Sequence, residues 1–127
     1  MTDFDTLIRI IEDNFKPESV HNEEEAEKEL LDFLNSRFPN SIHARGHSST
    51  GVKIDIVVEG TYAIELVTIN NEGRLITLMN QIMESKEDFA HIAVILLDIG
   101  KIPSDIVKDY VNEYKKLGVR TVVKQTY

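Results

Sequence analysis

Apolar side chains recur every three or four positions in four stretches of the chain, and this spacing predicts four amphipathic helices. Asn22 is expected to cap the second helix, with Glu25 three residues later as its partner in a capping-box-like pair. Ser104 is expected to cap the fourth helix. The predicted helices are residues 3–15, 22–38, 74–86 and 104–117.

Runs of strand-forming residues lie between these helices, and two of them form a hairpin pattern. Residues 51–58 and 62–69 are separated only by Glu59-Gly60-Thr61, a spacing typical of two antiparallel strands joined by a tight turn. The continuous apolar run 92–97 predicts a buried strand. The other predicted strands are residues 41–46 and 119–124. The order α-α-β-β-β-α-β-α-β predicts an α/β domain.

Two carboxylates stand out on the predicted hairpin. Because side chains alternate along a strand, pairing the arms around Gly60 places Asp55 opposite Glu65. Two like charges about 4 Å apart repel by roughly 4 kcal/mol at an effective dielectric near 20, and a divalent cation would offset that repulsion. Two alternatives stay open: the register is shifted by one residue, or one carboxylate simply points to water.

Both faces of the predicted hairpin are otherwise apolar, so both are expected to be covered. In an α/β domain a charged pair at the end of such a hairpin would lie in a cleft. The face of Asp55 and Glu65 is expected to carry Val57, Ala63 and Val67, and the opposite face Ile54, Ile56, Val58, Ile64 and Leu66.

The 127 residues are expected to form a single domain, and the hydrophobic content of 42% is ordinary for a globular protein. Cysteine is absent, which excludes disulfides, thiolate metal sites and a cysteine nucleophile. The first residues show no signal-peptide pattern and no apolar run approaches membrane-spanning length. A cytoplasmic protein without membrane contact is therefore expected.

The net charge of −8 is distributed unevenly. Residues 1–36 hold eleven Asp and Glu against three Lys and Arg, whereas residues 37–127 hold eleven of each. Residues 37–54 contain no acid and carry three cations, Arg37, Arg45 and Lys53. Because this stretch leads directly into Asp55, it is a candidate surface for a phosphate backbone. The alternative is a polar loop with incidental charges.

The helix at residue 22, a three-strand meander with Asp55 and Glu65 on its second and third strands, and the following helix and strand resemble the core of the PD-(D/E)xK phosphodiesterases. The similarity is closest to small archaeal Holliday-junction resolvases and Mrr-type nuclease domains. It covers residues 22–97, with helix 3–15 and residues 104–124 as additions to one nuclease-like domain, 1–127. The resemblance implies a restriction-endonuclease-like, three-layer α/β fold with a mixed central sheet.

The resemblance also implies roles for individual residues. Asp55, Glu65 and the backbone carbonyl of Leu66 would hold one or two Mg²⁺ ions, or Mn²⁺. A Glu on the preceding helix often adds a ligand in this family; Glu27 fits best, and Glu23, one turn earlier, is the second choice. Gln81 resembles the polar residue that the family's next helix sometimes turns toward the site.

The chain departs from the family at Val67, which stands where the family has a lysine that orients or deprotonates the attacking water. Valine cannot manage a proton. The register that pairs residue 55 with 65 also pairs 53 with 67, so Lys53 could deliver an ammonium to the same place. The alternative for Lys53 is a solubilising residue at the edge of the hairpin.

These observations favour a Mg²⁺-dependent endodeoxyribonuclease that binds duplex or branched DNA, and the resolvase-like relatives imply a homodimer. Because the family lysine is missing, activity is the open question. The first alternative is a catalytically degenerate nuclease-fold module with a binding or regulatory role. The second is a small-ligand binder that uses the C-terminal strand-helix-strand unit, for which the sequence shows no phosphate-binding fingerprint.

Overall fold

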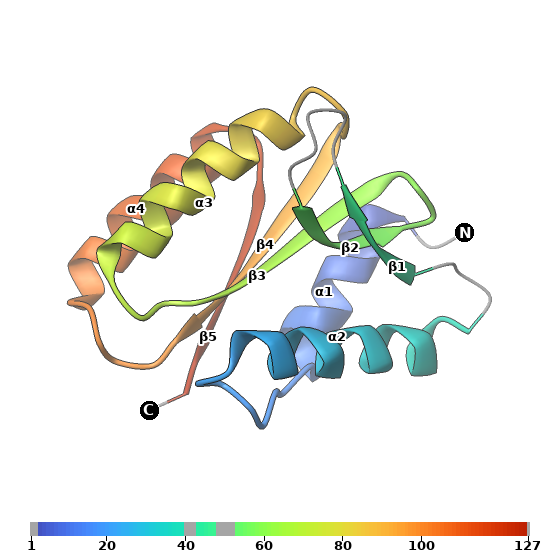
Figure 1. Ribbon diagram of the computed structural model, residues 1–127, viewed down its shortest axis with the longest axis horizontal. Helices are drawn as coiled ribbons and strands as arrows, with labels where there is room; N and C mark the ends of the chain where they lie inside the picture. The colour runs from blue at the N-terminus through green and yellow to red at the C-terminus, as the bar shows by residue number, and fades with distance from the viewer. Residues whose placement is uncertain (1–2, 40–42, 48–52, 127) are drawn as a thin grey trace.

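The computed structural model describes residues 3–39, 43–47 and 53–126, with side chains described outside residues 43–47 and 53. Figure 1 shows helices packed around one twisted sheet, which confirms the α/β class. The elements are α1 (Phe4–Asn14), α2 (Glu23–Arg37), β1 (His43–His47), β2 (Lys53–Val58), β3 (Tyr62–Thr68), α3 (Glu72–Ser85), β4 (His91–Asp98), α4 (Ser104–Lys116) and β5 (Arg120–Gln125).

The five strands of the described residues form a mixed sheet in the spatial order β1-β2-β3-β4-β5. Strands β1, β2 and β3 are antiparallel neighbours, whereas β3, β4 and β5 are parallel. Each parallel connection contains one helix, α3 before β4 and α4 before β5. The hairpin that carries Asp55 and Glu65 thus joins the antiparallel half of the sheet to the parallel half.

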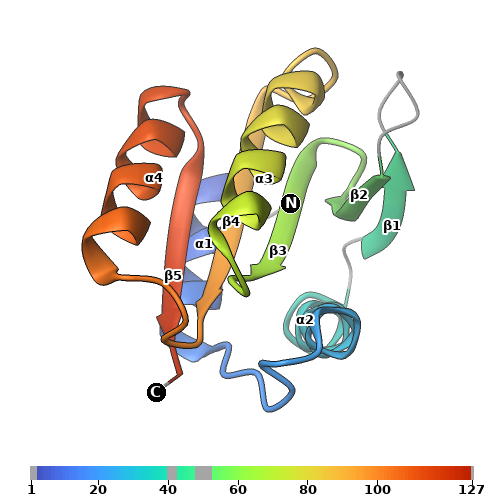
Figure 2. The same ribbon diagram turned by 60° about the vertical axis from the view of Figure 1, so that its left-hand side comes forward.

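Helices cover both faces of the sheet and make three layers (Figure 2). Helices α1 and α2 pack on one face, over a core that includes Ile56, Ile64 and Ile95. Helices α3 and α4 pack on the other face, over a core that includes Ala63 and Val94. Strands β3 and β4 are buried almost throughout, as expected for central strands between two helical layers.

Helix α1 packs against β5, the last strand of the sheet. Its apolar stripe is buried, and its polar edge reaches β5, where Arg120 forms an ion pair with Asp5 at 2.6 Å. The Lys124 ammonium also donates a hydrogen bond to the backbone carbonyl of Glu12. The beginning and the end of the described chain therefore lie side by side.

The predicted element bounds agree with the structure to within two residues, and the differences at two helix starts have local causes. Helix α3 begins at Glu72, two residues before the expected start, because the Asn71 side chain caps it by accepting from the Arg74 N–H at 3.1 Å. The expected cap of α4 was wrong: Ser104 is its first helical residue, and the cap is Pro103, which forms no side-chain cap hydrogen bond. Residues 41 and 42 of the first expected strand, and residues 51 and 52 of the second, lie outside the described residues.

Strand β2 contains a bulge at the position of Asp55. Its partner β1 pairs Ala44 with Val57 and Gly46 with Ile54, so two residues of β2 oppose one residue of β1. An extra residue in one strand shifts the alternation of the side chains beyond it. The bulge therefore changes the face of the sheet to which the side chains at the start of β2 point.

This shift corrects one expectation about the faces. Ile54 was expected on the face of Ile56 and Ile64, but it is buried in the opposite core, together with Ala63 and Val67. The other side chains of the two hairpin arms keep the expected alternation where the structure assigns them to a core. The hydrophobic spacing of the sequence could not reveal the bulge, because an isoleucine at position 54 can be buried in the core on either face of the sheet.

Helices in the described ranges are all too short or too polar to cross a membrane.

Candidate active site

The hairpin forms with the predicted register near its turn. The Thr61 N–H donates to the Val58 carbonyl at 3.0 Å, and Glu59 and Gly60 take positive φ angles of 53° and 68°. Gly60 accepts this backbone conformation without steric cost, which explains its place at the turn. Strands β2 and β3 then pair Val58 with Tyr62 and Ile56 with Ile64, as predicted.

Beyond Ile56 and Ile64 the two strands stop pairing within the described residues. In a continued ladder the Leu66 N–H would face Ile54; instead it donates to Asp55 Oδ2 at 2.7 Å. The bulge and this side-chain bond together end the ladder. The predicted pairs 55/65 and 53/67 are therefore not among the strand pairs of the described hairpin. The backbone of Lys53 pairs instead with His47 of β1.

The expected encounter of the two carboxylates is nevertheless present. Asp55 and Glu65 are 8% and 4% exposed, and their side chains are hydrogen bonded to each other. Burial raises the pKa of Glu65 to about 9, and the charge and side-chain hydrogen bond of Asp55 act in the same direction. A carboxyl with this pKa is protonated at neutral pH, so the pair holds a proton between two buried side chains.

Glu27 is the third carboxyl group of the site. It lies on α2 beside Ala26 on the face that is packed against the sheet, and it is only 3% exposed. Its charge further raises the pKa of Glu65. The structure thus brings Glu27, Asp55 and Glu65 into one electrostatic environment from three different elements.

Glu23, the second choice for the same role, has a different set of contacts. Its two carboxylate oxygens each accept from Arg74 Nη2 at 2.9 Å, and Oε1 also accepts from the Thr68 N–H at 2.9 Å. These bonds hold Glu23 against the end of β3 and the start of α3. Of the two candidates on α2, Glu27 is therefore the one whose charge acts on Glu65. The sequence contained no local signal for the Glu23 contacts, because the partner lies 51 residues away.

The structure shows fewer contacts for the other residues that the sequence assigns to the site. Gln81 is half-buried on α3 and makes no hydrogen bond with other described residues. The Leu66 carbonyl leaves β3 on the same side as its N–H, since both groups of a strand residue point the same way, and so faces the gap beside Asp55. Val67 is 1% exposed and packs in the apolar core under α3 and α4.

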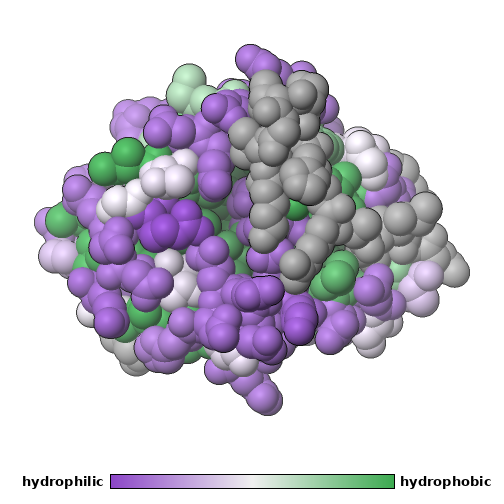
Figure 3. Space-filling model, in the orientation of Figure 1, coloured by the Kyte–Doolittle hydropathy of each residue, from purple (hydrophilic) through white to green (hydrophobic). Residues whose placement is uncertain are grey.

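The proposed phosphate contacts are only partly described. Arg37 is exposed at the end of α2, with its guanidinium carbon 5.5 Å from the centre of the Phe33 ring. The side chains of Arg45 and Lys53 lie outside the described residues. Figure 3 shows that the face presented by α2 is strongly hydrophilic, in agreement with the acidic composition of residues 1–36.

A divalent cation such as Mg²⁺ needs several oxygen ligands close together. Among the described residues, no group of three or more His, Cys, Asp or Glu side chains is arranged to hold a metal ion. The donor chemistry does fit, since carboxylate oxygens are the ligands that Mg²⁺ prefers. In addition, Glu65 Oε1 is buried and has no hydrogen-bond partner. A buried oxygen of this kind is satisfied by a cation or by a bound proton, and the pKa of Glu65 indicates a proton in the metal-free protein.

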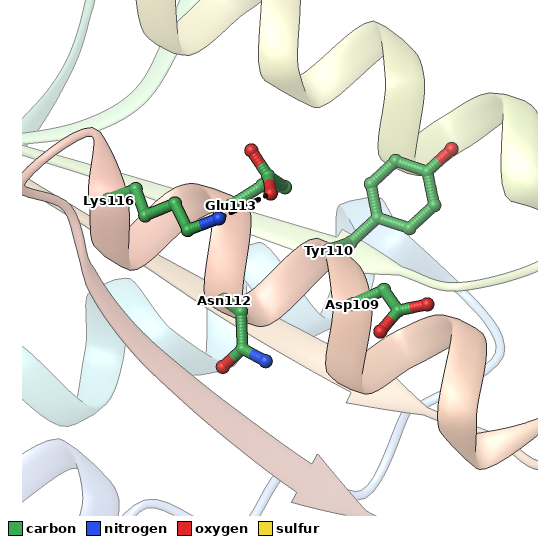
Figure 4. Close-up of a pocket in the computed structure, with 5 residues that line it drawn as sticks. All are labelled: Asp109, Tyr110, Asn112, Glu113 and Lys116. Carbon is green, nitrogen blue, oxygen red and sulfur yellow. Dashed lines mark hydrogen bonds and ion pairs between the residues drawn. The ribbon is translucent and has the colours of Figure 1, made fainter.

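Several cavities lined by described residues lie away from these carboxylates. One of about 400 Å³ runs along the outer side of α4 (Figure 4) and is lined by Asp109, Tyr110, Asn112, Glu113 and Lys116. Another, of about 320 Å³, lies between α4 and the ends of β4 and β5, where Asp98 follows the apolar run that predicted β4. The second cavity is at the low end of the size range of ligand pockets.

No protein-family model matches the chain, and no curated protein or solved structure matches it significantly. The resemblance to the PD-(D/E)xK phosphodiesterases therefore depends on the residues and the arrangement of elements described above.

Proposed function

We propose that this protein is a nuclease-fold DNA-binding protein that hydrolyses phosphodiesters with Mg²⁺ or Mn²⁺ bound at Asp55 and Glu65. The observation that carries the proposal is the buried, proton-sharing contact of these two carboxyl groups beside Glu27. Burying several ionisable groups together costs stability, and such arrangements cluster at functional sites. Both carboxylates come from the strand positions that the family resemblance assigns to metal binding.

The arrangement of the chain supports the same proposal. Three layers, a mixed sheet in the order β1-β2-β3-β4-β5, and a helix that brings a glutamate to the hairpin agree with the restriction-endonuclease-like fold that the resemblance implies. The site lies where β2 and β3 stop pairing, so the Leu66 N–H faces the Asp55 carboxylate in place of a ladder partner.

The protein's own groups would prepare the site for a cation. The Leu66 N–H fixes the orientation of Asp55, and Glu65 must release its proton before it can act as a ligand. Asp55, Glu65 and the Leu66 carbonyl would hold the ion, with Glu27 as an additional carboxylate. When bound, a divalent cation would polarise the phosphate and make a bound water more acidic.

DNA would approach from the side of β1 and β2. The hydrophilic, acidic helix α2 repels phosphate along most of its length, whereas the segment 37–54 carries Arg37, Arg45 and Lys53 and no acid. Pairing of two copies of the chain, and a cytoplasmic location, belong to the same proposal.

A second candidate function is supported by one observation. Val67 is buried in an apolar core at the position where the family has its lysine, and Lys53 is not paired with it in the described hairpin. A nuclease-fold module that binds DNA or a cation without cleavage would have no use for that lysine. The side chain of Lys53 decides between the two functions, because it is the one substitute that the sequence offers.

Cleavage assays on linear duplex, single-stranded and four-way-junction DNA with Mn²⁺ test the proposal. The wild type is expected to cleave, Asp55→Asn to be inactive, and Lys53→Met to be slower by roughly 10²-fold, the usual effect of losing an acid–base group. Asp109→Asn, an exposed acid on α4, is the matched control and should leave the rate unchanged. If the wild type cleaves none of these substrates, the enzyme is excluded and the binding module remains.

A further inference from the structure

The carboxylate of Glu23 joins three elements of the fold at one point. Both of its oxygens accept from the same nitrogen, Nη2 of Arg74 on α3, at 2.9 Å, and Oε1 also accepts from the backbone N–H of Thr68 at the end of β3. The Thr68 hydroxyl in turn donates to the carbonyl of Val20, just before α2, at 2.9 Å. The first turn of α2 and the segment just before it are thereby each tied to the end of β3.

This cluster, formed by Glu23, Arg74 and Thr68 and called the clamp below, lies close to the candidate site in the chain. Glu23 precedes Glu27 by four residues on α2, so the two side chains lie on neighbouring turns of the same helical face, about 6 Å apart along the axis. Thr68 follows Glu65 by three residues on β3. The clamp consequently joins the two elements that carry Glu27 and Glu65.

Arg74 is itself held in place. It occupies the first turn of α3, where its N–H is bonded to the capping side chain of Asn71. The side chain of Arg74 is 30% exposed and that of Glu23 is 32% exposed, so the ion pair is half-buried. The planar guanidinium donates in fixed directions, which the freely rotating ammonium of a lysine does not.

We propose that Glu23 and Arg74 are positioning residues for the carboxylate site. The clamp fixes the rotation of α2 about its own axis and its position relative to β3, and so holds Glu27 beside Glu65. The inference rests on the proposed function, because it treats Asp55, Glu65 and Glu27 as the cation site. It gives Glu23 and Glu27 separate roles, since Glu23 fixes the helix and Glu27 faces the ion.

The test is the affinity for Mn²⁺, measured by electron paramagnetic resonance on the full chain. Arg74→Met should weaken Mn²⁺ binding by roughly 10-fold or more, the usual effect of removing a group that orients a metal ligand. Arg74→Lys should bind with intermediate affinity. Arg120→Met is the matched control, because the ion pair of Arg120 with Asp5 joins α1 to β5 and makes no contact with the site; it should change the affinity by less than about twofold.

A double-mutant cycle separates positioning from general damage to the fold. If the clamp acts through Glu27, Arg74→Met should have little further effect on Mn²⁺ affinity in a Glu27→Gln background. Circular dichroism identifies variants that do not fold, and Glu23→Gln, which keeps an acceptor for the Thr68 N–H, then replaces Arg74→Met in the cycle.

The possible results distinguish a failure of the positioning role from a failure of the proposed function. Wild-type binding that Arg74→Met leaves unchanged, or effects of Arg74→Met and Glu27→Gln that simply add, would overturn the positioning role and leave the cation site intact. If the wild type itself does not bind Mn²⁺, the proposed function is wrong and the positioning role is overturned with it.

Discussion

Asp55 accepts a hydrogen bond from the backbone N–H of Leu66 at 2.7 Å, at the point where β2 and β3 stop pairing. A side chain here takes the place of a ladder bond between the strands. The carboxylate is therefore fixed by the backbone of the strand that carries Glu65, and the two acidic side chains meet through this local separation of the strands.

The first prediction concerns cation binding and Asp55. Asp55→Asn keeps an oxygen that can accept from the Leu66 N–H, but it removes one of the two charges that would hold a cation. Mn²⁺ should raise the melting temperature of the wild type by mass action and should not raise that of Asp55→Asn. Without metal, the substitution should stabilise the protein only near and above pH 9, where Glu65 loses its proton and would otherwise repel the Asp55 carboxylate. Scanning calorimetry with and without Mn²⁺ measures both effects, and an equal Mn²⁺ response in the two proteins would exclude this site.

The second prediction concerns the dependence of stability on pH. The pKa of Glu65 is about 9 in the folded protein, against an ordinary value of 4.5. Between these values the folded state holds a proton that the unfolded state has lost, so the free energy of unfolding falls as pH rises. The contribution is complete below about pH 4.5 and is lost by about pH 9, with a slope of at most about 1.4 kcal/mol per pH unit for one proton.

Glu65→Gln should flatten this dependence, because the amide stays neutral throughout and resembles the protonated acid. Urea denaturation of the metal-free protein from pH 5 to 9 would measure the change. Glu84→Gln, on an exposed part of α3, is the control and should keep the wild-type slope. Parallel curves for wild type and Glu65→Gln would mean that Glu65 does not hold the proton.

The helices and strands, their order and the hairpin register near Gly60 could be predicted from the sequence, because each depends on local periodicity. Residues 56 and 64 pair as the turn dictates. The meeting of Asp55 and Glu65 was also predicted, although it occurs through side chains and not through a strand pair. Local patterns were sufficient wherever a turn or a buried face fixed the geometry.

The bulge at Asp55 and the contacts of Glu23 could not be predicted, for a different physical reason. A bulge depends on how β1 pairs with β2, and the apolar Ile54 fits either face of the sheet. Glu23 stands in a run of three acids that resembles an ordinary helix start, while its partner Arg74 is far along the chain. Such interactions depend on tertiary packing and leave no trace in the spacing of residues.

The third prediction concerns the packing of α3 against α4. Tyr114 is fully buried, and its hydroxyl donates to the Leu75 carbonyl at 2.7 Å. Burial raises the pKa of Tyr114 above its ordinary range, so the hydroxyl remains a donor at neutral pH. Tyr114→Phe should lower the free energy of unfolding by about 1 kcal/mol. Tyr110→Phe, at a half-buried ring 6.3 Å from that of Tyr114, removes no hydrogen bond between described residues and should change it little. Chemical denaturation measures both, and equal stabilities would show that this bond contributes nothing.

The fourth prediction concerns the approach of DNA. If Arg37 contacts phosphate, the affinity for duplex DNA should fall with salt concentration. Arg37→Ala should reduce the log–log slope by roughly 0.9, the contribution of one neutralised phosphate. Lys108→Ala removes an exposed cation from α4 and serves as the control, with an unchanged slope. Fluorescence anisotropy between about 50 and 200 mM salt would measure the slopes. A slope that Arg37→Ala leaves unaltered would place the DNA elsewhere.

The position of α1 against β5 has a consequence for the order of folding. The contact between Asp5 and Arg120 joins residues 115 positions apart, so its formation closes almost the whole described chain into one loop. During synthesis, the apolar stripe of α1 is made first and has no complete surface to cover until the last strand has left the ribosome. We expect α1 to dock late, and the nascent chain to expose Leu7, Ile8 and Ile11 to chaperones until then.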